Sequence, residues 1–332
     1  MSLSFFKNKS VLITGGTGSF GRAFARTLLE KSKASRIIIF SRDEWKQWEM
    51  QNAFSEHDRE RLRFFLGDVR DKERLHRALN DVQVVVHAAA LKQVPAAEYN
   101  PTEFVQTNIH GAMNVIDASI DRGVEHLIAL STDKSVNPVN LYGATKLCSD
   151  KLFLAANAYT GKARKPKMSV VRYGNVLGSR GSLLPFWQQL IQKGAKELPV
   201  TDPEMTRFWI PLQDAVDFVT KCFSEMQGEE LFVPKMPSVK ITEMAKAIAP
   251  DLPIKIIGIR EGEKLHELLI SPDESHYTLE MKDHFLLLPP IYAKTFEERS
   301  KRRGGTKVDA SFSYTSNNNP HLLNAAELKK II

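Results

Sequence analysis

Short apolar runs alternate with longer amphipathic stretches through the first half of the chain. Apolar runs occupy residues 10–14, 36–40, 62–66, 82–87, 127–131 and 167–173, and stretches with helical spacing lie between them. Such alternation is typical of buried parallel strands joined by helices. The pattern therefore predicts an α/β fold with a Rossmann-type, doubly wound parallel sheet.

The alternation becomes irregular after residue 178. Asn140 and Thr242 are placed to cap helices. We expect a smaller C-terminal α/β region over residues 179–295, and a tail with a short helix over residues 296–332. A long helix is predicted at residues 102–122 of the regular part. Beyond residue 178 the predicted helices are at residues 183–192, 211–223, 242–248 and 325–332, and the short strands at 198–201, 230–233 and 254–258.

A glycine-rich turn directly follows the first predicted strand. Gly15, Gly18 and Gly21 stand between that strand and an amphipathic helix. This is the context in which a dinucleotide fingerprint binds a pyrophosphate at a helix N-terminus. A P-loop would need Lys and then Ser or Thr at the positions of Arg22 and Ala23. We therefore expect a dinucleotide-binding domain over residues 1–178, with later segments returning to it. Its turn is completed by Thr17, Ser19 and Phe20.

The second predicted strand ends in polar residues that bear on the choice of coenzyme. Ser41 and Arg42 stand where an acid usually binds the ribose of NAD, and Lys46 follows one turn later. A hydroxyl and a guanidinium suit the 2′-phosphate of NADP. We predict NADP rather than NAD, although Asp43 keeps NAD open as an alternative.

Residues at the ends of other strands complete the predicted coenzyme site. Asp68 is placed to accept a hydrogen bond from the adenine amino group. Asn108 begins or interrupts the helix predicted at residues 102–122, and it has two interpretations, as a coenzyme contact or as a structural bond to a neighbouring strand. Small residues after the fourth strand let the backbone lie against the coenzyme. The remaining predicted contacts are Val69, Ala88, Ala89, Ala90, Leu130, Ser131, Tyr173 and Asn175.

Side chains with catalytic potential gather after the fifth predicted strand. Thr132, Asp133 and Lys134 stand at its carboxyl end, where open α/β sheets bind ligands. Tyr142 and Lys146 lie one turn apart on one face of the following helix. A nearby ammonium favours the phenolate, so we expect a lowered pKa for this tyrosine. It would then act as a base toward a sugar or alcohol hydroxyl.

A second polar group follows the predicted strand at residues 254–258. Arg260 suits the phosphates of a nucleotide diphosphate, and Glu263 suits its ribose hydroxyls. A surface salt-bridge cluster is the alternative interpretation.

Composition narrows the class of protein without deciding its function. The 332-residue chain has a net charge of +7 and a pI of about 9.2, which fits anionic ligands such as nucleotides, or nucleic acid. The basic residues are scattered apart from residues 299–303. Two cysteines, Cys148 and Cys222, and the lack of an apolar leader predict a cytoplasmic protein without a membrane span. The nine histidines show no metal-binding spacing, so no metal is expected.

Together these motifs resemble the extended short-chain dehydrogenase/reductase superfamily. More narrowly, nearly the whole chain is similar to the soluble inverting UDP-N-acetylglucosamine 4,6-dehydratases, the first enzymes of pseudaminic acid synthesis. The segments TGGTGSFG, ALSTDKSVNPVNLYGATK, VRYGNVLGSRGS, TDPEMTRFWI and IGIREGEKLHE carry the similarity. Retaining sugar dehydratases of the superfamily have Thr-Asp-Glu where this chain has Thr-Asp-Lys.

The resemblance implies a role for each candidate residue. Tyr142, helped by Thr132 and Lys146, would take the proton from the sugar O4 while the hydride at C4 moves to NADP. Lys134 would remove the C5 proton, for which its pKa must fall, and Asp133 would protonate the departing C6 hydroxyl. Family members commonly form hexamers, so a homo-oligomer is expected, with no nucleic-acid or membrane partner. Substrate contacts are expected from Lys92, Asn175, Arg180, Thr201, Met205, Arg260 and Glu263.

Three alternatives remain open. A 4-epimerase could use the same scaffold, although the Asp133–Lys134 pair argues against it. A non-catalytic NADP-binding or RNA-binding protein of this fold has only the high pI in its favour. A third alternative is a dehydratase that acts on a different nucleotide sugar.

Overall fold

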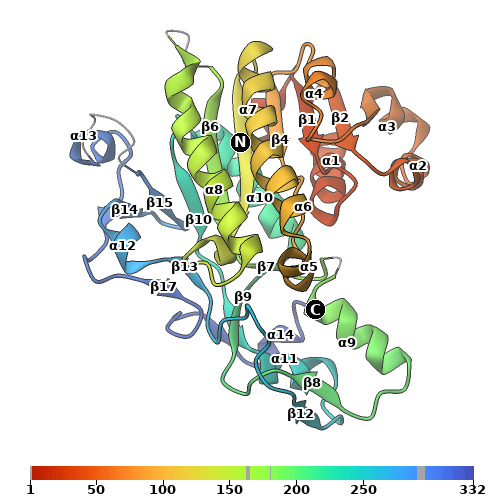
Figure 1. The fold of residues 1–332 in the computed structure, drawn as a ribbon, viewed down its shortest axis with the longest axis vertical. Coiled ribbons are helices and arrows are strands. Elements are labelled where there is room, and N and C mark those ends of the chain that lie inside the picture. Colours follow the sequence, from red (N-terminus) through yellow and green to blue (C-terminus); the bar gives the residue numbers. More distant parts are fainter. Residues whose placement is uncertain (1, 162–164, 180, 290–295) are drawn as a thin grey trace.

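A ten-stranded sheet forms the centre of the computed structural model, which describes residues 2–161, 165–179, 181–289 and 296–332 (Figure 1). Its first six strands follow the order 3-2-1-4-5-6 of a doubly wound sheet, and all neighbouring pairs among them are parallel. The predicted fold class is therefore confirmed. The strands are β1 (Ser10–Thr14), β2 (Arg36–Ser41), β3 (Leu62–Leu66), β4 (Val84–His87), β5 (His126–Thr132) and β6 (Lys167–Tyr173).

The second half of the chain extends the same sheet. Strand β10 (Leu231–Pro234) pairs in parallel with β6, and β15 (His284–Leu287) pairs antiparallel with β10. Strands β14 (Thr278–Glu280) and β16 (Thr306–Lys307) complete this edge. Segments from beyond residue 178 thus return to the main sheet. The division at that residue stays a prediction.

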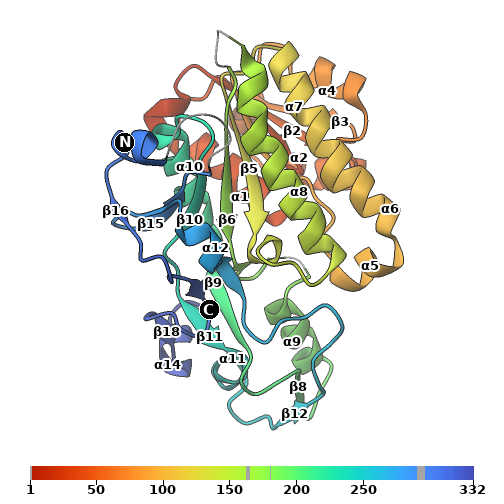
Figure 2. The same cartoon turned by 60° about the vertical axis from the view of Figure 1, so that its left-hand side comes forward.

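Helices cover both faces of the sheet (Figures 1 and 2). On one face, α1 (Ser19–Lys31) packs beside α10 (Leu212–Glu225). On the other, α4 (Lys72–Ala78), α7 (Gly111–Asp121) and α8 (Leu141–Ala155) lie side by side. Because both faces are covered, strands such as β1 are buried along their whole length, which explains their continuous apolar runs. Near the outer strands lie α2 (Glu44–Asn52) and α3 (Glu56–Arg61).

A second hydrophobic cluster, built around Trp187 and Trp209, lies below the main sheet in Figure 1. It contains Leu323 and Leu328, so the C-terminal tail is packed against this cluster. The surrounding strands are β7 (Asn175–Val176), β8 (Leu198–Val200), β9 (Thr206–Ile210), β11 (Ser238–Lys240), β12 (Ile254–Ile256) and β18 (Leu322–Leu323), and the helices α9 (Leu183–Gln192), α11 (Ile241–Ile248) and α14 (Ala325–Leu328). Two further strands, β13 (Leu268–Ile270) and β17 (Tyr314–Thr315), pair with each other. Two short helices, α12 (Pro272–Ser275) and α13 (Phe296–Ser300), also lie in the second half of the chain.

The helix expected at residues 102–122, which Asn108 was expected to begin or interrupt, is divided into α6 (Pro101–Phe104), a π-helix (Val105–His110) that contains Asn108, and α7, with α5 (Val94–Tyr99) before them. One predicted helix cap was wrong. Helix α11 begins at Ile241 with Lys240 at its N-cap, so Thr242 lies inside the helix and does not cap it. By contrast, Asn140 caps α8 as expected, because its Oδ1 accepts a hydrogen bond from Gly143 N at 2.8 Å.

Candidate active site

The glycine turn connects β1 to α1 in a conformation that side chains would obstruct. Gly15 has φ +64°, and a Cβ there would lie 2.9 Å from the backbone of Ala89. Gly18 is the N-cap of α1. The N-terminus of α1 therefore faces the end of β4 with no side chain at the N-cap. This arrangement suits a pyrophosphate.

A buried hydrogen-bond network fixes the end of β4. Thr14 Oγ1 accepts the N–H groups of Ala88 and Ala89, both at 3.2 Å, and lies 2.8 Å from His87 Nδ1. Burial, with a smaller contribution from Lys146, lowers the pKa of His87 to about 3. The neutral imidazole can therefore accept the Thr14 proton, which gives every member of the network a partner. The expected wall of small residues beside the glycine turn is thus held in place.

The end of β2 carries the residues predicted to choose the coenzyme. Arg42 is half-exposed and lies 3.6 Å from Asp68. Asp43 caps α2 and forms an ion pair with Lys46, while Ser41 Oγ accepts from Gln47 at 3.1 Å. Both Lys46 and Asp43 are thus engaged with each other, whereas the Arg42 side chain extends toward solvent.

Asp68 has a stronger partner than the sequence indicated. Arg70 lies 2.9 Å from its carboxylate, and Arg42 adds a second positive charge. Burial alone would raise the pKa of Asp68, but Arg70 and Arg42 outweigh it and lower that pKa. Asp68 is therefore an ionised hydrogen-bond acceptor at the edge of the site, and its role toward an adenine stays a prediction.

Helix α8 packs directly on the turn that follows β5. A side chain on Gly143 would collide with the carbonyl oxygen of Lys134, so only glycine permits this approach. The contact brings Tyr142 and Lys146 to the end of β5, as predicted. Lys146 Nζ donates to Leu130 O at 2.8 Å.

The pKa of Tyr142 differs from the prediction. The side chain is 8% exposed. Burial raises the pKa of Tyr142 to about 12, even though Lys134 and Thr132 act in the opposite direction. We expected a neighbouring ammonium to lower the pKa of Tyr142 below its ordinary value. This prediction was wrong, because burial outweighs the effect of the protein's own charged and polar groups. The cation that acts on the phenol is Lys134 rather than Lys146.

Asp133 and Lys134 form a buried ion pair. Asp133 Oδ1 accepts from Lys134 Nζ at 3.0 Å and from Thr132 Oγ1 at 2.9 Å. Burial raises the pKa of Asp133, although Lys134 opposes this shift. Burial alone would lower the pKa of Lys134, but Asp133 and Glu267 outweigh it, and the pKa is raised. The predicted fall in the pKa of Lys134 was therefore wrong, because two carboxylates lie beside its amine.

Sequence reasoning missed two charged residues of the site. Glu267 and Arg207 both lie within segments that carry the family resemblance, yet neither was assigned a role. Arg207 is 7% exposed and belongs to a strand, β9, that is buried throughout. A charged residue within an otherwise apolar run was the available signal, since such residues are rarely buried without a partner.

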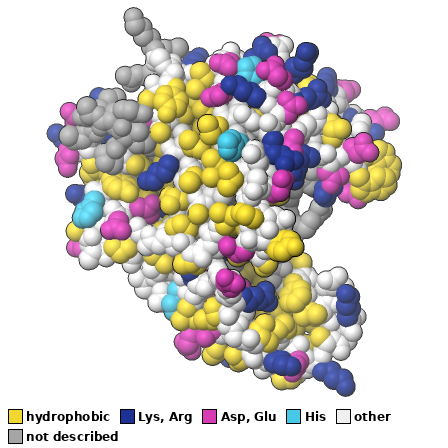
Figure 3. Space-filling model, in the orientation of Figure 1, with side chains coloured by type: hydrophobic (Ala, Val, Ile, Leu, Met, Phe, Trp, Pro, Cys, Tyr) yellow, Lys and Arg dark blue, Asp and Glu magenta, His cyan; other side chains and the backbone are white. Residues whose placement is uncertain are grey.

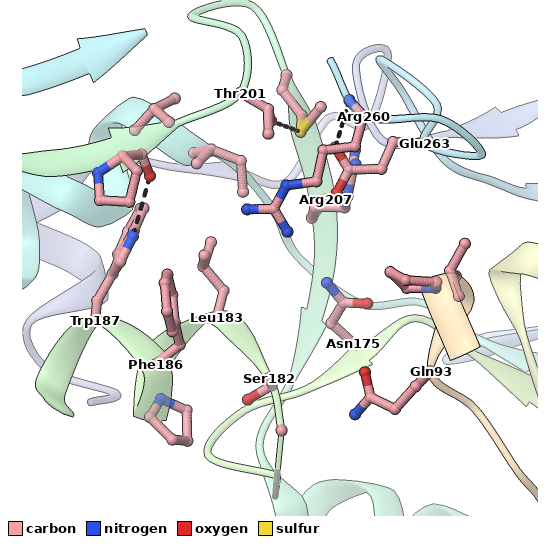
Figure 4. Close-up of a pocket in the computed structure, with 18 of the residues that line it drawn as sticks. Gln93, Asn175, Ser182, Leu183, Phe186, Trp187, Thr201, Arg207, Arg260 and Glu263 are labelled. Atoms are coloured by element: carbon pink, nitrogen blue, oxygen red, sulfur yellow. Dashed lines mark hydrogen bonds between the residues drawn. The ribbon is translucent and has the colours of Figure 1, made fainter. Parts of the chain in front are cut away.

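A pocket of about 870 Å³ opens beside Lys134. Figure 4 shows Arg207, Arg260 and Glu263 on one side, facing Phe186 and Leu183 of α9 across the cavity. A polar, basic wall opposite an apolar wall suits a ligand with both anionic groups and rings.

The structure brings most of the predicted substrate contacts together. The pocket is lined by Asn175, Thr201, Met205, Arg260 and Glu263. Lys92 is outside this lining set, but burial and the charge on Lys134 lower its pKa, which places it near the same group. Arg180 lies outside the described residues.

Charges of both signs are mixed on one face of the molecule (Figure 3). On the face drawn in Figure 3, basic and acidic side chains of the described residues are interspersed. In the same part of the chain, no group of three or more His, Cys, Asp or Glu residues is arranged to hold a metal ion. Nor does any described helix have the length and apolar character needed to cross a membrane.

The strand order, the glycine turn and the Tyr142–Lys146 helix define an extended short-chain dehydrogenase/reductase, which confirms the resemblance found in the sequence. Residues 11–289 match the family described as polysaccharide biosynthesis protein, and the chain belongs to that family. It is 55% identical over 331 residues to the UDP-N-acetylglucosamine 4,6-dehydratase (inverting) of Campylobacter jejuni, covering 98% of each chain. It is 39% identical over 340 residues to a UDP-glucose 4-epimerase of Rickettsia massiliae, covering 98% of this chain and 96% of that protein.

Solved structures share the same fold. Pen from Bacillus thuringiensis superposes with a TM-score of 0.88 at 32% identity, covering 99% of this chain and 98% of that one. The dTDP-glucose 4,6-dehydratase of Streptomyces venezuelae, solved with NAD bound, has a TM-score of 0.68 at 23% identity and covers 77% of this chain and 86% of its own. At that identity the second likeness shows the fold alone.

Proposed function

We propose that this protein is an inverting 4,6-dehydratase of UDP-N-acetylglucosamine. The observation that carries the proposal is the meeting of Asp133, Lys134 and Tyr142 around the end of β5, with Lys134 in the pocket wall. An acid, an amine and a phenol at one place are the groups that oxidation at C4 followed by loss of water requires. The relative of the same described activity, 55% identical over almost the whole chain, supports this choice.

A nicotinamide coenzyme would supply the redox chemistry by accepting the C4 hydride and returning it to C6. The glycine turn, α1 and the end of β4 fit its pyrophosphate. We propose NADP, because Arg42 extends beside the end of β2, where a 2′-phosphate would pair with it. The neighbour from Streptomyces holds NAD, so NAD is the alternative.

Tyr142 takes the proton from the sugar O4. Burial opposes ionisation of the phenol, while Lys134 and Thr132 favour it. The cationic ring of an oxidised coenzyme would add further positive charge beside the phenol. Lys146, one turn along the same helix, is held at the β5 backbone by its bond to Leu130 O.

Asp133 and Lys134 exchange one proton to become the acid and the base. A shift across their 3.0 Å hydrogen bond converts the ion pair into a neutral amine and a carboxylic acid in a single step. Lys134 then removes the C5 proton, which is acidic beside the C4 ketone, and Asp133 protonates the C6 oxygen, which leaves as water. The raised pKa of Lys134 is compatible with this role because the amine becomes neutral only within the pair.

The pocket binds the nucleotide. We assign Arg260 to the diphosphate and Glu263 to the ribose, with Thr201 and Met205 in the adjoining wall and Asn175 nearer the reacting sugar. A place at the start of pseudaminic acid synthesis, a cytoplasmic location and a hexameric assembly remain predictions.

A 4-epimerase is the second candidate, favoured by the 39% identical relatives that carry that description. Incubation with UDP-N-acetylglucosamine in deuterated water separates the two activities. A dehydratase gives a product lighter by one water, with deuterium at C5, whereas an epimerase gives a product of unchanged mass with inverted C4.

A variant assigns the C5 step. Lys134→Ala should abolish deuterium exchange at C5 while leaving coenzyme binding intact. Normal exchange in this variant would show that another group is the base.

A further inference from the structure

Glu267 is a buried carboxylate in the pocket wall. The proposed reaction assigns no step to this residue. It is 2% exposed and lines the pocket together with Lys134 and Arg207. Its Oε1 lies 3.4 Å from Lys134 Nζ and 3.7 Å from Arg207 Nε. Its Oε2 has no hydrogen-bond partner among the residues that the structure describes. Burying a charge with one oxygen unpaired is costly, so stability alone does not explain this residue.

The backbone of Glu267 is anchored by the C-terminal tail. Glu267 N donates to Ser316 Oγ at 2.9 Å, and Ser316 N donates to Glu267 O at 2.9 Å. Ser316 Oγ is also 2.6 Å from Thr206 Oγ1, next to Arg207 in β9. The same hydroxyl therefore holds the backbone N–H of Glu267 and the residue that precedes Arg207.

The two carboxylates that flank Lys134 have unequal surroundings. Burial alone would raise the pKa of Glu267, but Lys134, Arg207 and Lys264 outweigh it and the pKa is lowered. Burial raises the pKa of Asp133, and the negative charge of Glu267 adds to that increase. The two shifts run in opposite directions, and both favour Asp133 over Glu267 as the carboxyl that takes up a proton.

We propose that Glu267 is a positioning residue for the dehydration: it stays ionised, holds the Lys134 amine at the pocket wall and makes Asp133 the carboxyl that carries the proton. The inference rests on the proposed function. One proton moves from Lys134 to Asp133, the C5 proton then passes to the Lys134 amine, and the Asp133 proton leaves with the C6 hydroxyl as water. The pair returns to an ammonium and a carboxylate, and Glu267 keeps its charge throughout.

The charge on this pair is set from every element around it. The groups facing it are Glu267 before β13, Arg207 of β9, Lys264 of the preceding loop, Lys92 before α5 and Tyr142 of α8. Of these neighbours, Glu267 is the carboxylate that touches Lys134 besides Asp133.

The pH dependence of turnover tests the proposal. Activity requires one proton on the Asp133–Lys134 pair, so the profile falls where the pair gains a second proton and where it loses the first. Glu267→Gln removes a negative charge that favours protonation of both groups. Both limbs should therefore move to lower pH by about one unit or more. Limbs at the wild-type pH would overturn the proposal.

Two matched variants separate charge from packing. Arg207→Gln removes a positive charge from the same cluster, so it should move the limbs to higher pH. Ser316→Ala loosens the Glu267 backbone but keeps all charges, so turnover should fall without a shift of the profile. The same shift in Ser316→Ala as in Glu267→Gln would assign Glu267 a merely structural role.

A measurement without substrate keeps the inference apart from the proposed function. Infrared spectra recorded against pH would follow the carboxylic acid band of Asp133, assigned by its loss in Asp133→Asn. In Glu267→Gln the midpoint of this band should move to lower pH, and an unchanged midpoint would overturn the inference. If the wild-type protein releases no water from the sugar nucleotide but the band shifts, the proposed function fails while the charge assignment stands.

Discussion

Asn108 holds the helix that carries Tyr142 in place, so its removal should affect both stability and turnover. Its amide makes three hydrogen bonds, with Leu91 N at 2.8 Å, Leu91 O at 2.9 Å and Thr145 Oγ1 at 3.0 Å. The residue is 2% exposed and lies within the π-helix at residues 105–110, so water cannot replace these bonds easily. The side chain joins the loop after β4 to α8.

The expected cost of Asn108→Ala follows from the groups left behind. The N–H and the C=O of Leu91 both lose their partner, and each such buried group costs about 1–3 kcal/mol. Leu91 is itself only partly buried, and Thr145 keeps its 2.8 Å bond to Tyr142 O. We therefore expect a loss of about 2–4 kcal/mol in the free energy of unfolding. Turnover should fall about tenfold or more, because the phenol is no longer held in place.

Urea unfolding followed by circular dichroism measures the first effect, and steady-state kinetics the second. Asn114→Ala is the matched control in α7: it removes bonds of 3.0 Å to Val69 O and Arg70 O at a partly exposed position. Water can replace those bonds, so the control should lose less than about 1 kcal/mol. Equal losses in the two variants would refute the argument that Asn108 is a buried structural bond.

Three further predictions follow from the site. Arg42→Ala should weaken NADP binding about 10- to 100-fold while changing NAD binding little, because one charged phosphate contact is lost. Titration with both coenzymes measures the two affinities, and equal weakening of both would contradict the assignment. Gly143→Ala should destabilise the fold by about 1–3 kcal/mol, since its Cβ meets the Lys134 carbonyl, whereas Ala144→Gly on the same helix should cost about 1 kcal/mol. Burial lowers the pKa of His87 to about 3. Below pH 6.5 this histidine is therefore protonated in the unfolded chain but not in the folded chain, so stability falls as pH drops from 6.5 toward 3. His87→Asn should reduce this slope by about 1.4 kcal/mol per pH unit in urea unfolding at several pH values, and an unchanged slope would mean that His87 titrates alike in both states.

The parts of the site with local signals could be predicted from the sequence. The strand, glycine turn and helix at residues 10–31 are adjacent in the chain, and so are the residues that link the end of β5 to α8. Asn140 could be recognised as a cap because a cap needs only its own helix. The fold class followed from the alternating pattern for the same reason.

The protonation states could not be predicted, since they depend on residues brought together by folding. Lys134 was expected to lose its proton, but Glu267, which is far away in sequence, adds a second carboxylate beside it. Tyr142 was expected to be acidic, but burial by the surrounding chain dominates. The pattern likewise predicted the helix over residues 102–122. It could not show the partners of the Asn108 side chain, because this side chain hydrogen-bonds to Leu91 outside the helix, at a π-helical turn.

The anchoring of Glu267 by Ser316 has a consequence for biosynthesis. As the polypeptide leaves the ribosome, strands β1 to β6 are available early and the coenzyme half can begin to fold. The hydroxyl that holds Glu267 N and Thr206 emerges only when residue 316 has been added. A nascent chain thus completes the charge arrangement around Lys134 last, after most of the scaffold already exists.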